Sequence, residues 1–437
     1  MKHLDSRLRR YRRNSILLLL VAAAIIVAAV KPSDRGAAYE PYFSSLNREL
    51  RAAGPGRPVM LLDLDRLDRN LGILKKKIRE PQKFRLVVKS LPSMHLVRYV
   101  CGKMDTKRLM VFHQPDLNYL AEKIGGGYDI LLGKPMPVRA VREFYRTVRA
   151  AGGFNPAADI QWLADTPARL IQYRDLAAEK NIKMRVSIEI DVGLHRGGAA
   201  SFEDLDAMLG VIAGSGGRLS LSGFMGYDVH AGSAPALFRS KEGAVRSAFG
   251  KMLARYRSFY DHGRAKYPGL FTGDLTFNSG GSHTYPLFDG SGPVNDIAAG
   301  SGLVKPSDFD SLLLKDHEPA LFIAAPVLKS LRGTTIPYLE WLSGPMRLWN
   351  PNRQRTYFIY GGGWRAAYRS PAGLEDNDIY GFSTNQAFIN GSDRTALSVD
   401  DYVFFRPSQS EGIMREFGDI IAVRKGKIAE RWPAFPE

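Results

Sequence analysis

The chain has 437 residues, of which 45% are hydrophobic and 24% are charged, so it is long enough for two globular domains besides any targeting segment. Its net charge is +17, but the basic residues are scattered outside the N-terminus and no nucleic-acid-binding module is recognisable, so no nucleic-acid partner is expected. Cys101 is the single cysteine, which excludes an intramolecular disulfide and a zinc site built from several thiolates.

The first segment, residues 1–38, indicates where in the cell the protein is located. A cluster of arginines precedes an uninterrupted apolar run of 15 residues at Ile16–Val30, short of the ~20 residues of a typical bilayer span. A run that is apolar all round and follows basic residues indicates an export signal or a transmembrane anchor. Because arginines stay on the cytoplasmic side, we expect a protein of the bacterial inner membrane or periplasm, with its folded domains periplasmic. The arginines are Arg7, Arg9, Arg10, Arg12 and Arg13.

Residues 39–295 alternate between predicted strands and helices. Eight strands alternating with helices predict an α/β fold with a (β/α)₈ barrel of the TIM type. The predicted strands are Pro58–Asp63, Phe84–Val88, Arg108–Phe112, Tyr128–Leu132, Asp159–Leu163, Met184–Ile190, Leu219–Gly226 and Asp274–Asn278. The predicted helices include Asp65–Arg79, Pro137–Ala151, Pro167–Lys180 and Lys241–Lys266.

Residues 296–437 have a different pattern. Short β-like runs lie between Gly, Pro, Asn and Asp turns, and no long amphipathic helix separates them. The runs include Ala320–Ser330, Thr356–Ile359, Asp401–Phe405 and Asp419–Arg424. This pattern predicts a C-terminal all-β domain after the barrel.

Polar residues stand at the C-terminal ends of the predicted strands, where a TIM-type barrel carries its functional groups. The apolar run Phe84–Ser90 ends by presenting Lys89. The Ser-Gly-Gly-Ser loop at Ser279–Ser282 offers backbone N–H groups to a phosphate, and Arg196 and Tyr227 suit the edge and face of an aromatic ring. With a lysine opposite, the set indicates pyridoxal 5′-phosphate as the cofactor. Further polar residues at strand ends are His113, Asp165, Asp191, His195, Asp228 and His230.

Several motifs together resemble a known family. They lie at Pro58–Leu71, around Lys89, and at Glu189–Gly198, Tyr227–His230, Asn278–Thr284, Gly300–Asp310 and Tyr360–Trp364. The chain resembles fold-type III pyridoxal-phosphate enzymes, closest to the D-threonine aldolase and D-serine dehydratase family, whose barrel is shared with alanine racemase. The resemblance implies a small amino-acid substrate and a homodimer whose active sites are completed across subunits.

The same resemblance implies roles for individual residues. Lys89 would hold the cofactor covalently and then move the α-proton or assist β-elimination, activated by desolvation and nearby positive charge. Arg196 would reach the polar edge of the cofactor ring, and Tyr227 would contact the ring or its nitrogen. The phosphate would be held by Gly280, Gly281, Ser282 and Ser301. His230 would orient the substrate as a second catalytic residue, with a purely structural role as the alternative.

One stretch departs from the family. Its members bind a divalent metal through a His-x-Asp or His-x-Cys pair that follows a proline. Here Gln409 and Glu411 stand at the corresponding positions after Pro407. An amide and one carboxylate make a poor transition-metal site, so no metal is expected, although a harder ion could bind through oxygen.

Three functions remain open on the sequence. The first is a lyase of the aldolase or dehydratase type that acts on D-amino acids with a remodelled metal site. The second is a periplasmic amino-acid racemase, which needs a second base on the opposite face of the ring. Tyrosines of the C-terminal region offer candidates for that base, namely Tyr338, Tyr357, Tyr360 and Tyr368. The third is a membrane-tethered protein that binds pyridoxal phosphate without turnover.

Overall fold

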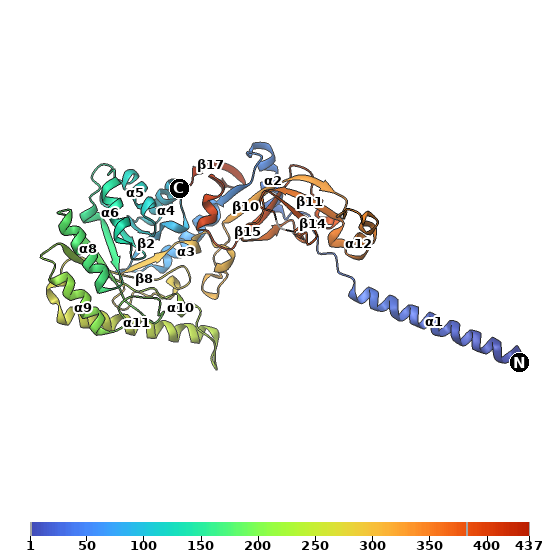
Figure 1. Cartoon of the computed structure of the whole chain (residues 1–437), viewed down its shortest axis with the longest axis horizontal. Coiled ribbons are helices and arrows are strands. Elements are labelled where there is room, and N and C mark those ends of the chain that lie inside the picture. Colours follow the sequence, from blue (N-terminus) through green and yellow to red (C-terminus); the bar gives the residue numbers. More distant parts are fainter. Residues whose placement is uncertain (1, 382, 437) are drawn as a thin grey trace. The chain divides into compact units, whose positions relative to one another are not determined.

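The computed structural model describes residues 2–381 and 383–436, apart from the side chains of residues 2–10, 23, 24 and 26–28 (Figure 1). The chain forms two compact units that are discontinuous in sequence. The first, here called the β unit, comprises Met1–Pro58, Ala324–Trp364 and Tyr368–Phe405. The second, the barrel unit, comprises Val59–Ile323, Arg365–Ala367 and Arg406–Glu437. The C-terminal segment of the chain therefore belongs to the barrel unit.

Eight parallel strands form the closed barrel that the sequence predicts. They follow one another in chain order around the ring, and the first pairs with the last, for example at Phe84 and Ile297. The strands are β2 (Lys83–Val87), β3 (Arg108–Val111), β4 (Asp129–Leu132), β5 (Ile160–Ala164), β6 (Met184–Glu189), β7 (Leu219–Met225), β8 (Thr276–Ser279) and β9 (Asp296–Ala299). The predicted (β/α)₈ fold is confirmed, because each barrel strand is buried and parallel to both of its neighbours.

Two strand assignments made from the sequence are wrong. The predicted first strand corresponds to β1 (Val59–Asp63), which lies outside the barrel and pairs in parallel with β16 (Asp419–Arg424). The eighth barrel strand is instead β9, which begins at Asp296. All five residues of β1 are buried and a helix follows it, so its local pattern is that of a barrel strand. The partner of a strand is chosen by long-range pairing, which the local pattern does not specify.

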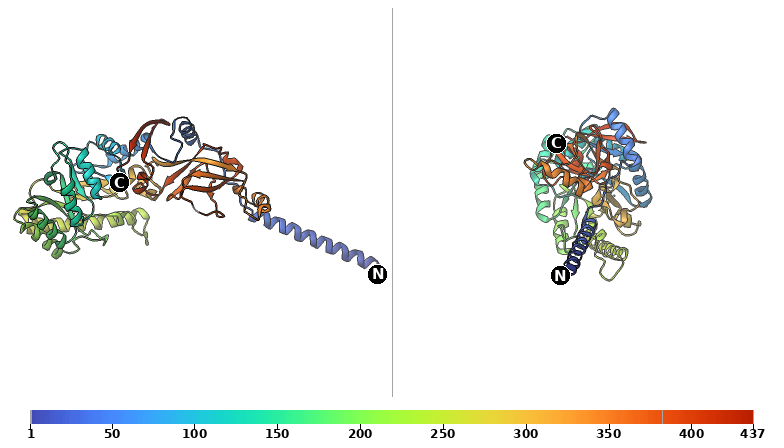
Figure 2. Two further views of the ribbon diagram at one scale, coloured as in Figure 1. Left: turned by 45° about the horizontal axis from the view of Figure 1, so that its top comes forward. Right: turned by 90° about the vertical axis from the view of Figure 1, so that its right-hand side faces the viewer.

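Helices surround the barrel, as Figures 1 and 2 show. The longer helices bury apolar residues on one face, as Val141 and Phe144 illustrate in α6. The helices of this unit are α3 (Leu64–Lys77), α4 (Met94–Met104), α5 (Gln114–Lys123), α6 (Val138–Thr147), α7 (Pro156–Asp159), α8 (Pro167–Glu179), α9 (Phe202–Ala213), α10 (Val229–Gly232) and α11 (Lys241–Lys266). The helix α9 begins with a capping box, in which the side chains of Ser201 and Asp204 each accept a backbone N–H of the other residue.

A buried ionic cluster fills the barrel near the N-terminal ends of its strands. Arg85 of β2 is fully buried, with its Nε 2.6 Å from Asp296 Oδ1 and its Nη2 2.9 Å from Asp129 Oδ2. Burial alone would lower the pKa of Arg85, but the charges of Asp296 and Asp129 raise it overall. Asp296 and Asp129 are the first residues of β9 and β4. The cluster thus stabilises one end of the barrel and leaves the C-terminal ends of the strands for a ligand.

The C-terminal segment packs on the barrel within the same unit. Its strands β16 and β17 (Lys427–Pro433) are antiparallel. The Arg424 side chain donates to the Tyr99 hydroxyl at 2.7 Å, and the Trp432 ring is stacked on His95. Arg415, in the short 3₁₀ helix η10 (Gly412–Arg415), pairs with Asp116 at 2.6 Å. These contacts hold residues 406–437 against the helices that follow β2 and β3.

The β unit confirms the predicted C-terminal domain as a mostly-β fold. Its antiparallel strand order is β13–β14–β11–β10, and β15 pairs with both β10 and β12. The strands are β10 (Leu321–Leu331), β11 (Arg355–Tyr360), β12 (Ala366–Ser370), β13 (Glu375–Asp376), β14 (Gln386–Gly391) and β15 (Tyr402–Pro407). Two short helices accompany them, α2 (Pro41–Ala53) and α12 (Ser343–Trp349).

The predicted apolar run Ile16–Val30 forms the end of the helix α1 (Lys2–Val30). The side chains from Ile16 to Leu20 are exposed. Within residues 2–381 and 383–436, no helix combines the length and the apolar character that crossing a membrane requires.

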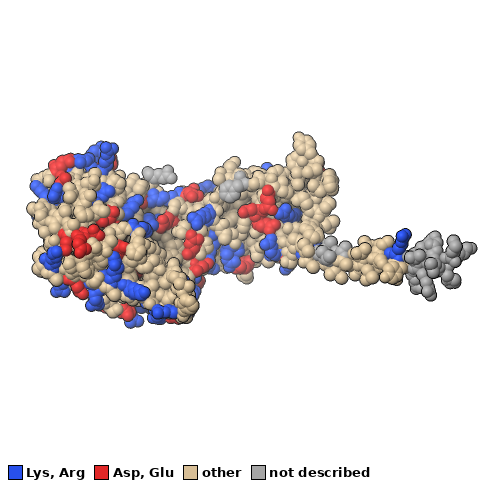
Figure 3. Space-filling model, turned by 60° about the horizontal axis from the view of Figure 1, so that its bottom comes forward, with Lys and Arg blue, Asp and Glu red and all other residues tan. Residues whose placement is uncertain are grey.

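On the face shown in Figure 3, Lys and Arg residues are interspersed with Asp and Glu rather than gathered in one basic patch.

Candidate active site

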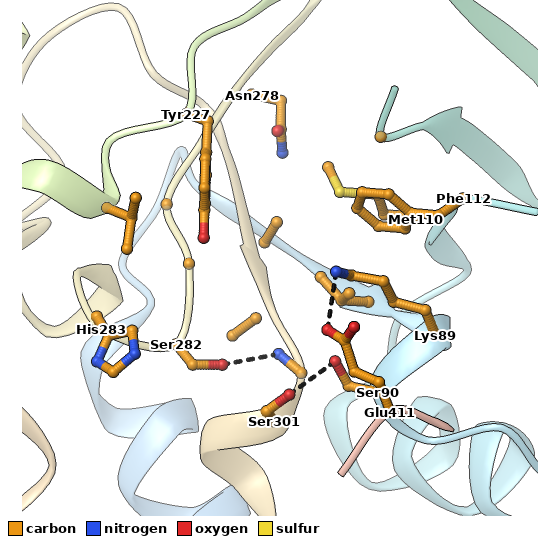
Figure 4. Close-up of a pocket in the computed structure, with 18 of the residues that line it drawn as sticks. Lys89, Ser90, Met110, Phe112, Tyr227, Asn278, Ser282, His283, Ser301 and Glu411 are labelled. Carbon is orange, nitrogen blue, oxygen red and sulfur yellow. Dashed lines mark hydrogen bonds and ion pairs between the residues drawn. The ribbon is translucent and has the colours of Figure 1, made fainter. Parts of the chain in front are cut away.

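A cavity of about 280 Å³ lies at the C-terminal ends of the barrel strands (Figure 4). Its lining comes from the residues that follow successive strands: Lys89 after β2, Phe112 after β3, Gly133 after β4, Tyr227 after β7 and Gly280 after β8. The structure brings together all seven residues that the sequence assigns to the cofactor. Lys89, Arg196, Tyr227, Gly280, Gly281, Ser282 and Ser301 all line this cavity, as do Gln409 and Glu411.

Lys89 is presented by a single 3₁₀ turn, η1 (Val88–Ser90), which follows directly on β2. Its neighbours Val88 and Ser90 are buried, so the turn directs the lysine side chain toward the cavity. Lys89 Nζ lies 2.7 Å from Glu411 Oε1 and 4.5 Å from the centroid of the Phe112 ring. The charged group in contact with the lysine is therefore a carboxylate, whereas the nearby positive charge that the sequence predicts, Arg196, lines the same cavity.

Two glycine-rich loops form a cradle for an anion. The Ser282 Oγ accepts the N–H groups of Gly300 at 3.3 Å and Gly302 at 2.8 Å, which joins the loop after β8 to the loop after β9. Within the described part of the chain, the N–H groups of Gly281, Ser282 and Ser301 donate to no acceptor, and all three residues line the cavity. Unpaired N–H groups from successive loop residues are the donors that a phosphate requires.

Glycine is required where the loops approach the lysine turn. A Cβ atom added at Gly300 would lie 2.8 Å from both Ser90 Oγ and Val87 Cβ. Gly280 has φ 89°, a conformation that other residues rarely adopt. The close approach keeps the anion cradle next to the turn that carries Lys89.

Arg196 and Tyr227 form a stacked pair on another wall of the cavity. The Arg196 guanidinium carbon lies 4.7 Å from the centroid of the Tyr227 ring. Burial and the neighbouring Asp228 raise the pKa of Tyr227, so its phenol stays protonated. A Cβ atom at Gly281 would lie 3.1 Å from the Tyr227 ring, so the anion loop packs directly on this ring. Tyr227 thus offers an aromatic face beside the cradle.

Asp228 ties the tyrosine to the anion loop, a role that the sequence did not assign. Its Oδ1 accepts the Thr284 hydroxyl at 2.8 Å, whereas its buried Oδ2 has no hydrogen-bond partner among the described residues. Burial raises the pKa of Asp228 to about 7, and hydrogen bonds from Thr284 and the backbone only partly offset this effect. A protonated carboxyl group at this position explains how a fully buried acid is tolerated without a cation.

His230 does not line the cavity. Val229 lies there instead, and His230 Nδ1 is buried without a hydrogen-bond partner among the described residues. Burial lowers the pKa of His230 and favours its neutral form. Next to it, the exposed His195 contacts Asp191 through Nδ1 at 2.7 Å, and Asp191 also accepts the backbone N–H of His195 at 3.0 Å. A role of His230 in orienting the substrate stays a prediction.

Gln409 and Glu411, which stand at the family's metal-binding positions, contact other side chains. Gln409 Nε2 donates to Asp308 Oδ2 at 2.7 Å, and Glu411 pairs with Lys89. Across the residues that the structure describes, no three His, Cys, Asp or Glu side chains converge as metal ligands would.

Three buried serines connect this stretch to Lys89. The Ser410 hydroxyl donates to Ser301 Oγ at 3.0 Å, and the Ser301 hydroxyl donates to Ser90 Oγ at 2.9 Å. The Ser301 hydroxyl is thus already used, and only its backbone N–H is left for the phosphate. No local sequence pattern predicts this chain of serines, because they lie in three distant segments.

The fold and the site together define a class. Residues 62–266 match the family described as alanine racemase, N-terminal domain. The barrel is therefore of the alanine racemase type found in fold-type III pyridoxal-phosphate enzymes, which confirms the resemblance seen in the sequence.

Solved structures that cover most of the chain have a similar fold. D-threo-3-hydroxyaspartate dehydratase from Delftia sp. HT23 is 16% identical with a TM-score of 0.64, over 87% of this chain and 97% of that chain. D-threonine aldolase from Filomicrobium marinum is 15% identical with a TM-score of 0.62, over 86% and 96% of the two chains. Alanine racemase from Bacillus anthracis is 15% identical with a TM-score of 0.63, over 86% and 97%. No curated protein matches the chain.

Pyridoxal 5′-phosphate is the cofactor expected for this class, and the residues present fit it. The unpaired N–H groups of Gly281, Ser282 and Ser301 suit its phosphate, the Tyr227 face suits its ring, and the Lys89 amine suits its aldehyde. All of these groups line one cavity.

Proposed function

We propose that the protein is a pyridoxal-phosphate enzyme that acts on amino acids, and that its reaction is D-amino-acid cleavage or elimination of the aldolase or dehydratase type. The observation that carries the proposal is the placement of Lys89 and the anion cradle in the same cavity. The similarity to a D-threonine aldolase and a D-threo-3-hydroxyaspartate dehydratase supports the choice of reaction.

Different residues of the chain perform different parts of the proposed reaction. The cofactor, when bound, supplies an electron sink that stabilises negative charge at the substrate's α-carbon. Lys89 anchors it and, at Nζ, accepts and returns the proton of the reacting carbon or hydroxyl. Glu411, 2.7 Å away, stabilises Lys89 whenever Nζ carries that proton. The anion cradle and the Tyr227–Arg196 pair hold the cofactor so that its aldehyde lies next to Lys89.

A racemase is the second candidate. The alanine racemase similarity and the presence of Gln409 in place of a metal-binding imidazole favour it. A racemase needs a second proton-carrying group, for which the sequence offers the tyrosines Tyr338, Tyr357, Tyr360 and Tyr368. Two of them are already engaged: the Tyr357 hydroxyl contacts Thr395 Oγ1 at 2.8 Å, and the Tyr368 hydroxyl donates to Asp376 at 2.5 Å. Tyr357 and Tyr368 are therefore weaker candidates for that group than Tyr338 and Tyr360.

Product analysis separates the reactions. The protein, loaded with pyridoxal 5′-phosphate, is incubated with D- and L-amino acids with and without divalent metal ions. Glycine with an aldehyde indicates aldol cleavage, a 2-oxo acid with ammonia indicates elimination, and the opposite enantiomer indicates racemisation. We expect one of the first two from a D-amino acid, and loss of product in Lys89→Ala. Racemisation as the main reaction would contradict the lyase proposal.

We also propose that the protein works on the periplasmic side of a bacterial inner membrane, as a homodimer. The arginine cluster before Ile16–Val30 supports the location, and the resemblance to the family supports the dimer. Cell fractionation and analytical ultracentrifugation of the purified chain test the two parts. Full-length protein recovered with the cytosol would contradict the first, and a monomer at micromolar concentration would contradict the second.

A further inference from the structure

Glu411 places a carboxylate inside the cavity of the proposed active site. Its Oε1 lies 2.7 Å from Lys89 Nζ, and Figure 4 shows the two side chains pointing toward one another. Among the described residues that line the cavity, Glu411 alone has an acidic side chain, whereas Lys89 and Arg196 are basic. A negative charge thus lies next to the nitrogen at which the proposed chemistry occurs.

The backbone that presents this carboxylate is anchored by the two preceding side chains. Gln409 Nε2 donates to Asp308 Oδ2 at 2.7 Å, and the buried Ser410 hydroxyl donates to Ser301 Oγ at 3.0 Å. Glu411 is therefore held at a defined place in the cavity. The Gln409 amide is neutral and already engaged, so it adds no positive charge that would compensate the carboxylate.

Attachment of a cofactor changes what Glu411 can pair with. When the Lys89 ammonium condenses with an aldehyde, two of its three hydrogens leave with the aldehyde oxygen as water. The third stays on the nitrogen or is released to solvent, so the nitrogen carries at most one N–H in place of three. While Lys89 holds the aldehyde, Glu411 therefore has free acceptor sites beside the position that the substrate must occupy.

We infer that Glu411 selects substrates by charge, and that the pocket takes amino acids whose side chain carries a cation, such as a second amino group or a guanidinium. The inference rests on the proposed function, in which the substrate's α-carbon approaches Lys89, whose Nζ is 2.7 Å from Glu411 Oε1. A substrate side chain directed to that side of the cavity then meets the carboxylate. Charges interact more strongly in a partly desolvated cavity than in water, so a cationic side chain is favoured and an acidic one is rejected.

A matched series of substrates tests this inference. D-ornithine, D-norvaline and D-glutamate have side chains of similar length with positive, zero and negative charge. For each, the dissociation constant is obtained from the change in the absorption spectrum of the bound cofactor. Because these side chains carry no β-hydroxyl to cleave or eliminate, kcat/KM is measured for exchange of the α-hydrogen with deuterated solvent. We expect both quantities to favour D-ornithine over D-glutamate by at least tenfold, with D-norvaline between them.

Two variants assign the preference to Glu411. Glu411→Gln keeps the shape of the side chain and removes its charge, and it should reduce the preference at least tenfold. Glu416→Gln, on an exposed residue of the same segment that does not line the cavity, should leave the preference unchanged. A charge preference that survives in Glu411→Gln would overturn the inference.

The outcomes separate this inference from the proposed function. Cofactor bound at Lys89 with equal dissociation constants for the three amino acids would overturn the inference alone. Absence of cofactor from Lys89 would overturn the proposed function, and the inference with it. The substrate series measured on the unmodified protein tests the charge preference even if Glu411→Gln folds poorly.

Discussion

The ammonium of Lys89 and the carboxylate of Glu411 form an ion pair of 2.7 Å across the cavity, although they come from opposite ends of the barrel unit's sequence. The two side chains are 37% and 39% exposed. Pairs of this exposure contribute little to stability, because solvent screens them and both side chains lose rotamer freedom. The pair therefore matters for the position and charge of the lysine more than for the fold.

This view predicts that Glu411→Gln lowers the free energy of unfolding by less than about 1 kcal/mol. Urea denaturation of the cofactor-free protein measures the change. A loss of several kcal/mol would show that Glu411 supports the fold and would contradict a role confined to the cavity.

The buried ionic cluster of Arg85, Asp129 and Asp296, in contrast, is expected to contribute strongly to stability. Arg85→Met leaves Asp296 and Asp129 inside the barrel without their main cation, and we expect a loss of about 3–5 kcal/mol in the free energy of unfolding. Arg174→Met, in an exposed pair with Asp175, is the control and should change stability by less than about 0.5 kcal/mol. Similar stabilities for the two variants would refute the structural role of the cluster.

The anion cradle predicts a specific loss of cofactor. Gly300→Ala would place a methyl group 2.8 Å from Ser90 Oγ, so the cradle and the lysine turn must move apart. We expect cofactor binding to weaken at least tenfold, about 1.4 kcal/mol, in equilibrium titrations with pyridoxal 5′-phosphate. Gly412→Ala is the control, because an added Cβ there meets nothing within 4 Å. Unchanged binding in Gly300→Ala would show that this loop does not hold the cofactor.

Asp228 predicts a pH dependence of stability. Its pKa is raised by burial to about 7, so the folded state favours the protonated acid. The stability that this proton provides is complete below about pH 4 and is lost as the pH rises through 7. Asp228→Asn cannot ionise, so it should gain stability relative to the unmodified protein between pH 4 and 8. Urea midpoints measured across this range test the difference, and parallel curves would contradict it.

The barrel and most of the site could be predicted from the sequence because their signals are local. An apolar run that ends in a polar residue marks the C-terminal end of a strand, as for Lys89 after β2 and Tyr227 after β7. The Ser279–Ser282 loop is likewise recognisable as an anion-binding loop from its two glycines. These residues meet at one end of the barrel because parallel strands end on the same side.

What the sequence did not predict depends on contacts between distant segments. The buried run of β1 has the same pattern as a barrel strand, but its partner is β16. The serine chain from Ser410 to Ser90 and the pairing of Glu411 with Lys89 arise because residues 406–437 return to the barrel unit. No local pattern encodes which segments pack together.

The central claim is that Lys89 holds pyridoxal 5′-phosphate, and covalent trapping tests it most directly. The loaded protein is reduced with borohydride, digested and analysed by mass spectrometry, with Lys89→Ala treated in parallel. We predict a reduced pyridoxyl-phosphate adduct on the peptide that contains Lys89 and no adduct in the variant. A loaded protein that carries no adduct on Lys89 would contradict the account.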